Sequence, residues 1–138
     1  IYARPRSRRV ARFIGRANFL DGTVDRPLAA STYAVITRIG LVRARGDADL
    51  RPGARVSIAV RPEAIELRPE APDDQTSYAC TVEKTYFLGG AVDHILGCAG
   101  ETQLLAQTSP GRGVESGRQA HCTIDPEHAW ILREGDSG

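Results

Sequence analysis

Apolar and polar residues alternate along much of this chain, and the alternation is clearest in a stretch that occurs twice. In the first copy Val56, Ile58 and Val60 alternate with polar or small residues, and the corner Arg61-Pro62-Glu63 then leads into a short apolar run ending at Leu67. A period of two is typical of a half-buried strand. Proline has no N–H to donate to a ladder, so the corner predicts the end of one strand and the start of another.

The second copy has the same order of strand, Pro-Glu corner and strand. It begins at Gly117 where the first begins at Gly53, and it carries Pro126-Glu127 at the corner before ending at Ile131. The even spacing keeps equivalent residues on the same face of their strands. We favour a repeated small β unit over the alternative of two unrelated proline corners.

Other β-branched and aromatic runs are short and are separated by glycine and proline, which indicates further strands. The predicted strands cover about residues 17–25, 33–37, 39–44, 54–60, 64–67, 77–87, 91–97, 102–107, 118–124 and 129–133. Regular spacing of short strands predicts an all-β barrel or sandwich.

The organisation of the chain follows from the segments that break this pattern. Residues 68–76 are polar, contain two prolines and have no periodicity, which predicts a linker between β halves at about 16–67 and 77–133. Before the first strand, Val10, Phe13 and Ile14 are spaced as on a helix that Gly15 would end. The 138 residues include no methionine, so we expect a piece of a longer protein.

Composition narrows the classes of partner. The formal net charge is only +1, which gives little attraction to a polyanion, so nucleic acid is not an expected partner. The sequence has neither an apolar run long enough to cross a bilayer nor a signal peptide, and we expect a cytosolic location. Cys80, Cys98 and Cys122 lack a Cys-x-x-Cys spacing and are interpreted as small buried hydrophobes rather than as disulfides or zinc ligands.

Motifs for catalysis are not found. A nucleotide-hydrolysing P-loop needs a lysine that follows a glycine-rich loop, whereas the only lysine is Lys84, preceded by Val82-Glu83. Neither a Walker A, a signature nor a Walker B motif is recognised, and the histidines lack the spacing of metal ligands. We therefore predict no catalytic, cofactor-binding or metal-binding residues, and no enzyme activity, for this chain.

A set of short motifs in a fixed order resembles the TOBE (transport-associated OB-fold) domain, the C-terminal region of ATP-binding subunits from ABC importers. The resemblance covers essentially the whole chain and is sharpest at the Arg-Pro-Glu corner, and it is nearest to the group that serves polyamines, ferric ion and similar solutes. The motifs are Ile1-Tyr2-Ala3-Arg4-Pro5, Val10 to Gly15, Asn18 to Val24, Val60 to Ile65, Tyr86-Phe87-Leu88-Gly89 and Trp130-Ile131-Leu132.

The resemblance implies an OB-fold-like small barrel built from two similar β halves and preceded by one short helix. Residues 1–15 would be the tail and exit helix of an ATPase domain, and residues 16–138 a noncatalytic regulatory and dimerisation domain. Its expected partners are a second copy of the β domain, the ATPase domain of the same chain and the permease subunits. ATP and Mg²⁺ would belong to the ATPase domain, and the location would be peripheral, on the cytoplasmic side of the plasma membrane.

Six residues match the family's pattern and are predicted as interface or structural positions rather than as ligands. Arg61, Pro62 and Glu63 form the corner, Asn18 and Gly22 are expected at turn or strand-entry positions, and Gly89 is expected in a turn. An alternative function is a sensor of a small solute or oxyanion, bound at a barrel interface. Glycine turns such as Gly89-Gly90 and nearby basic residues would then hold the ligand.

Overall fold

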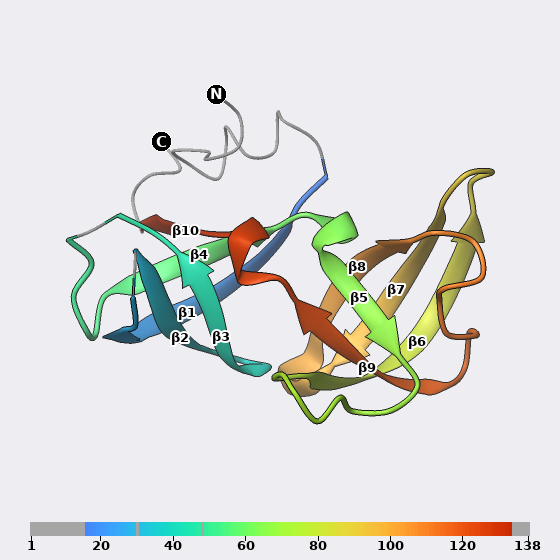
Figure 1. Ribbon diagram of the computed structural model, residues 1–138, viewed down its shortest axis with the longest axis horizontal. Coiled ribbons are helices and arrows are strands. Elements are labelled where there is room, and N and C mark those ends of the chain that lie inside the picture. The colour runs from blue at the N-terminus through green and yellow to red at the C-terminus, as the bar shows by residue number, and fades with distance from the viewer. Residues whose placement is uncertain (1–15, 30, 48, 134–138) are drawn as a thin grey trace. The chain divides into compact units, whose positions relative to one another are not determined.

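The computed structural model describes residues 16–29, 31–47 and 49–133 (Figure 1). The described residues form two compact units, the first made of those between 16 and 61 and between 126 and 133, and the second of Pro62–Asp125. The predicted N-terminal helix lies outside the described residues.

Strands make up most of the described chain, and each predicted strand is confirmed to within two residues at either end. The strands are β1 (Asn18–Pro27), β2 (Thr32–Thr37), β3 (Gly40–Arg45), β4 (Arg55–Val60), β5 (Ile65–Arg68), β6 (Tyr78–Phe87), β7 (Val92–Cys98), β8 (Thr102–Thr108), β9 (Gln119–Ile124) and β10 (Ala129–Arg133). Three short 3₁₀ turns are η1 (Pro62–Ala64), η2 (Ala99–Glu101) and η3 (Pro126–His128).

The first unit is a closed barrel with the strand order β1-β2-β3-β10-β4. Its neighbours are antiparallel except at the seam between β3 and β10, which is parallel and has the single pair Trp130–Arg45. Ile58, Val35 and Val42 are fully buried in its interior. The expected fold class, an all-β small barrel, is confirmed.

Burial in β4 goes beyond the alternation in its sequence. All residues from Val56 to Val60 are buried, including Ser57 and Ala59 on the face that the pattern predicts to be solvated. Ala59 packs with Leu132 of β10, and Phe19 of β1 packs against both. The outer face of this strand is therefore covered by neighbouring side chains, which a period-two pattern in a single strand cannot reveal.

The second unit is a five-stranded sheet with the order β5-β9-β6-β7-β8. Read around the closed barrel from β10, the order of the first unit is β10-β4-β1-β2-β3. The second unit has the same order, with β5, β9, β6, β7 and β8 in the corresponding places. Here, however, β5 and β8 are edge strands of the sheet. The second unit is an open version of the same arrangement.

The repeated corner is confirmed as a structural repeat, since strand, 3₁₀ turn and strand recur as β4-η1-β5 and β9-η3-β10. The pairings are reciprocal: β5 pairs with β9 from Ile65–Ile124 onward, and β10 pairs with β4 from Ala129–Val60 onward. Each half of the sequence thus supplies one strand to the unit of the other half (Figure 1). Residues 68–76, expected between the halves, join β5 to β6 within the second unit.

Backbone hydrogen bonds establish which positions of the two units are equivalent. The Val24 N–H donates to the Ala54 carbonyl and the Val82 N–H to the Arg118 carbonyl, each at 2.9 Å, just before a bulge in each strand. Val24 and Val82 also pair with Val35 and Leu96 respectively. With the strand registers, these bonds define equivalent pairs, which are Gly22 and Cys80, Thr37 and Cys98, Ile58 and Cys122, Arg45 and Gln107, Glu127 and Glu63, and Trp130 and Glu66.

Candidate functional site

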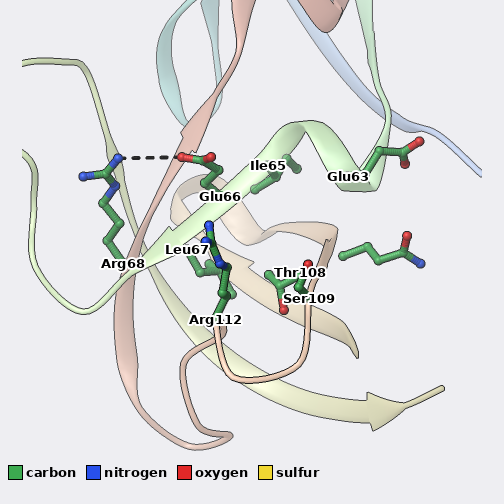
Figure 2. Close-up of a pocket in the computed structure, with 9 residues that line it drawn as sticks. Glu63, Ile65, Glu66, Leu67, Arg68, Thr108, Ser109 and Arg112 are labelled. Carbon is green, nitrogen blue, oxygen red and sulfur yellow. Dashed lines mark ion pairs between the residues drawn. The ribbon is translucent and has the colours of Figure 1, made fainter. Parts of the chain in front are cut away.

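A pocket of about 560 Å³ lies in the second unit at its edge strands β5 and β8. Its lining residues come from η1, β5, the end of β8 and the loop that follows β8. They are Glu63, Ile65, Glu66, Leu67, Arg68, Gln107, Thr108, Ser109 and Arg112 (Figure 2).

Strand β5 supplies both apolar and charged atoms because its side chains alternate. Ile65 and Leu67 are buried, whereas Glu66 and Arg68 are exposed. Arg68 Nη2 lies 3.7 Å from Glu66 Oε2, which is a long, solvent-exposed ion pair of small energetic value. The strand therefore keeps one guanidinium and one carboxylate at the pocket without a tight bond between them.

The opposite wall is built by the end of β8 and the turn after it. The Arg112 N–H donates to the Ser109 carbonyl at 3.1 Å, and Gly111 between them has φ +84°, a left-handed conformation that favours glycine. This turn directs the Arg112 side chain toward β5, above Thr108 and Ser109 (Figure 2). This wall thus contributes two hydroxyl groups and a guanidinium to the pocket lining.

The equivalent seam of the first unit shows why the second contains a pocket. In the first unit, Arg45 Nη1 lies 2.6 Å from Glu127 Oε2, and the guanidinium lies 5.2 Å from the centre of the Trp130 ring. The equivalent residues of the second unit are Gln107, Glu63 and Glu66, so it has neither the arginine nor the large aromatic ring. The side chains that bridge the first seam therefore have no counterparts beside the pocket of the second unit.

Polar residues behind the pocket are buried and bonded to one another. The ring nitrogens of His94 lie 3.2 Å from Thr85 Oγ1 and 3.0 Å from Thr108 Oγ1. Burial lowers the pKa of His94, and the nearby Asp93 carboxylate opposes this effect in part. Asp93 in turn accepts a hydrogen bond from the Gln107 side-chain amide at 3.1 Å. These bonds fix Gln107 and Thr108 at the pocket wall.

The six residues predicted from the family pattern do not converge on one site. Asn18 opens β1, where its side-chain amide donates to the Val60 carbonyl at 3.2 Å. Gly22 lies inside β1 rather than in a turn. A Cβ there would lie 2.6 Å from the Ile36 carbonyl oxygen, so the close approach of β2 requires glycine. Both positions hold the first barrel together.

The remaining predicted residues lie at the corner and at a hairpin. Arg61 is exposed after β4, Pro62 is buried in η1, and Glu63 is exposed in η1 and lines the pocket. Gly89 has φ +80° in the turn between β6 and β7, in open space. Glu63 is therefore the one predicted residue that belongs to the pocket.

Sequence reasoning misses Arg68 and Arg112, the two basic residues of the pocket. The polar composition of residues 68–76 places Arg68 in the linker, although its alternation with Leu67 continues the strand. Arg112 lies far along the chain in a loop whose position depends on the pairing of β7 with β8. The alternation could have placed Arg68, but no local signal links Arg112 to it.

Among residues 16–29, 31–47 and 49–133, there is no group of three or more His, Cys, Asp or Glu side chains arranged to hold a metal ion. Helices long and apolar enough to cross a membrane are likewise not found within those ranges.

Proteins with similar sequences are import ATP-binding proteins. The chain is 30% identical to the spermidine/putrescine import ATP-binding protein PotA of Frankia alni, over 97% of this chain and 32% of that protein. It is 32% identical to PotA of Rubrobacter xylanophilus, over 96% of this chain and 36% of that protein. For PotA 2 of Pseudomonas aeruginosa the identity is 32%, over 81% of this chain and 32% of that protein. The chain thus spans about a third of the length of the curated relatives it matches.

Structural comparison confirms the fold independently. The molybdate-bound crystal structure of the cytoplasmic molybdate-binding protein ModG matches with a TM-score of 0.74, covering 84% of this chain and 95% of ModG at 16% sequence identity. A family model described as the TOBE domain matches residues 58–132, from within β4 to within β10. With more than half of its residues inside that match, this chain belongs to the TOBE domain family.

Proposed function

We propose that this chain is a noncatalytic regulatory and dimerisation domain of the ATP-binding subunit of an ABC importer. Support comes from its similarity to spermidine/putrescine import ATP-binding proteins and from the match of residues 58–132 to the TOBE domain model. In this proposal an ATPase domain of the same protein binds ATP and Mg²⁺. Permease subunits then hold the whole protein at the cytoplasmic face of the membrane.

The proposed dimerisation rests on an apolar hairpin tip in the second unit. Tyr86, Phe87 and Leu88 are 49%, 81% and 54% exposed, at the end of β6 and the start of the turn that contains Gly89. A closing hydrogen bond from the Leu88 N–H to the Ala91 carbonyl, at 2.9 Å, holds this turn. Adjacent exposed apolar side chains on an ordered hairpin are typical of a protein contact surface. We assign a second copy of this domain as the partner.

Analytical ultracentrifugation tests this assignment. The wild-type chain should self-associate, and Phe87→Ser should shift it toward monomer because the most exposed ring is removed. Ile36→Ser is the matched control, since Ile36 is also an exposed apolar residue, at 52%, but lies in β2 of the first unit. Equal dissociation by both variants would contradict the role of the tip, and measurable ATP turnover by the chain would contradict the noncatalytic assignment.

A second candidate function is that of a small-solute or oxyanion sensor, and the pocket favours it. Arg112 has no ion-pair partner among the described residues. Its guanidinium and the hydroxyls of Thr108 and Ser109 are donors of the kind that bind an oxyanion. ModG, which has a similar fold, was crystallised with molybdate bound. The carboxylates of Glu63 and Glu66 would repel an anion. Arg68 and Arg112 would therefore have to supply most of the positive charge that binds it.

Isothermal titration calorimetry with molybdate, sulfate, phosphate and spermidine tests the sensor function. An oxyanion should release heat with the wild type and lose it with Arg112→Ala. Arg118→Ala is the matched control, because Arg118 is an exposed arginine outside the pocket lining. If no ligand of the panel releases heat, or if both variants lose binding equally, the pocket is not an oxyanion site.

A further inference from the structure

Three cysteines from different parts of the chain lie together in the second unit. Cys80 is on β6, Cys98 ends β7 and Cys122 is on β9, and β6 pairs with both other strands. Cys80 lies directly opposite Cys98, while Cys122 is opposite Tyr78, two residues before Cys80 on the same face of the sheet. The equivalent positions of the first unit hold Gly22, Thr37 and Ile58 and therefore have no thiol. The cluster is a feature of the second unit alone.

The pairing of Cys80 with Cys98 suits a cross-strand bond. Both backbone groups of Val82 point toward the segment that leads into β9. Its N–H donates to the Arg118 carbonyl at 2.9 Å, and its carbonyl accepts from the Gly117 N–H at 2.7 Å. Backbone groups alternate in direction along a strand, so Cys80, two residues earlier, also turns its backbone groups toward β9. Cys80 and Cys98 therefore form a non-hydrogen-bonded pair, in which Cα atoms are about 4.5 Å apart, inside the range of about 4.4–6.8 Å that disulfides require.

The three thiols also interact through hydrogen bonds. The Cys122 and Cys98 thiols donate to the Cys80 sulfur, which lowers the pKa of Cys80 to about 4 against the opposing effect of burial. A nearby charge on His121 acts in the same direction. Hydrogen bonding to Cys80 and burial raise the pKa of Cys122. Of the three thiols, Cys80 is thus the one whose pKa is lowered, which favours the thiolate, the form that reacts with oxidants.

Access to the cluster is provided at the end of β7. Cys80 and Cys122 are buried, at 5% and 0% exposed, whereas Cys98 is only partly buried. Cys98 is followed directly by the turn η2, which has no buried residue. Cys98 is therefore the sulfur nearest to solvent, and Cys122 is the least accessible of the three.

We propose that Cys80 and Cys98 form an oxidation site for small hydroperoxides, with Cys122 as a hydrogen-bond donor to the reacting sulfur. The Cys80 thiolate attacks one peroxide oxygen, so an S–O bond forms, the O–O bond breaks, and the leaving alkoxide or hydroxide takes a proton. The Cys98 sulfur then attacks the Cys80 sulfenic acid, forming the S–S bond and releasing water. Two thiols lose two electrons in total, and one hydroperoxide is reduced to an alcohol and water.

The test is hydrogen peroxide treatment of the folded 138-residue chain, followed by thiol titration and peptide mapping without reductant. We expect two of the three free thiols to be lost, one disulfide linking the peptides of Cys80 and Cys98, and full recovery with dithiothreitol. The same treatment in strong denaturant is the control, because unfolding removes the pairing and should remove the selectivity. A Cys80–Cys122 disulfide, or no disulfide at peroxide levels that oxidise free cysteine, would overturn the proposal.

Variants separate the role of each sulfur. Cys98→Ala should abolish the disulfide and leave a sulfenic acid on Cys80 that dimedone traps, whereas Cys122→Ala should still form the disulfide but severalfold more slowly. Unchanged disulfide yield in Cys98→Ala, or an unchanged rate in Cys122→Ala, would contradict the assigned roles. If circular dichroism shows that a variant is unfolded, the wild-type peptide map still decides whether Cys80 and Cys98 pair.

Discussion

The two units of this chain share a strand order but differ at one seam. In the first, β3 meets β10 and the barrel is closed; in the second, the equivalent strands β8 and β5 are edges beside a pocket. The difference lies in few side chains, since Arg45 and Trp130 of the first seam are replaced by Gln107 and Glu66. An ion pair and a ring contact thus bridge the first seam, while the equivalent edges of the second unit border the pocket.

A second difference lies in the interior of the two units. The first fills the positions equivalent to the cysteines with Gly22, Thr37 and Ile58, which serve close approach and packing. The second unit has the sulfurs of Cys80, Cys98 and Cys122 at these positions, and two of the three are buried. The three thiols and the pocket described above therefore all lie in the second unit.

Among the substitutions that test this comparison, Ile58→Ala should reduce stability the most. Ile58 is fully buried in the first barrel, so the variant loses apolar burial and leaves a cavity, at a cost of about 2–5 kcal/mol in the free energy of unfolding. Urea denaturation followed by the fluorescence of Trp130, the one tryptophan of the chain, reports on this unit.

Cys122→Ala is the matched substitution at the equivalent position of the second unit. It removes a single sulfur and should cost only about 1–2 kcal/mol. An equal loss of stability in both variants would show that the two interiors have the same role.

The variant Gly22→Ala tests the close approach of β1 to β2 in the first barrel. The added Cβ would meet the Ile36 carbonyl oxygen at 2.6 Å, and backbone cannot move aside cheaply, so we expect a loss of about 1–3 kcal/mol. Gly90→Ala is the control, because a Cβ there has no atom within 4 Å. Similar denaturation midpoints for the two variants would mean that β1 and β2 can separate without cost.

The seam itself is tested by Arg45→Gln, which copies Gln107 of the second unit. Loss of the ion pair with Glu127 and of the contact with the Trp130 ring should cost about 1 kcal/mol, because both interactions are partly exposed. Trp130 emission should shift to longer wavelength as the ring gains solvent.

The reverse substitution, Gln107→Arg, should place a guanidinium beside Glu63 and reduce the pocket. Any ligand found by calorimetry should then bind more weakly. Unchanged Trp130 emission in Arg45→Gln together with unchanged ligand binding in Gln107→Arg would show that these residues do not control the seam.

Sequence patterns predict the strands well, because alternation, glycine and proline are local signals that survive in the fold. The corner Arg61-Pro62-Glu63 and its repeat are also visible in the sequence. The reciprocal exchange of β5 and β10 cannot be seen in the sequence, because it depends on long-range pairing such as Ile65–Ile124 and Ala129–Val60. The meeting of the three cysteines follows from the pairing of β6 with β7 and β9, and the position of Arg112 from the pairing of β7 with β8. Spacing along the chain does not specify these pairings, so neither feature could be predicted from it.

The smallest effect that we expect is a pH dependence from His94, whose equivalent in the first barrel is Tyr33. Burial lowers the pKa of His94, so the unfolded chain binds this proton more readily than the folded chain. The contribution of His94 to stability is therefore complete above the ordinary histidine pKa of about 6.5 and is lost as the pH falls from there through the lowered folded value. Urea denaturation from about pH 7.5 down to about pH 4.5 should show this loss in the wild type and less of it in His94→Gln. Because the glutamine side chain of this variant can still bond to Thr85 or Thr108 but does not titrate, an equal pH dependence in both proteins would assign the effect to other groups.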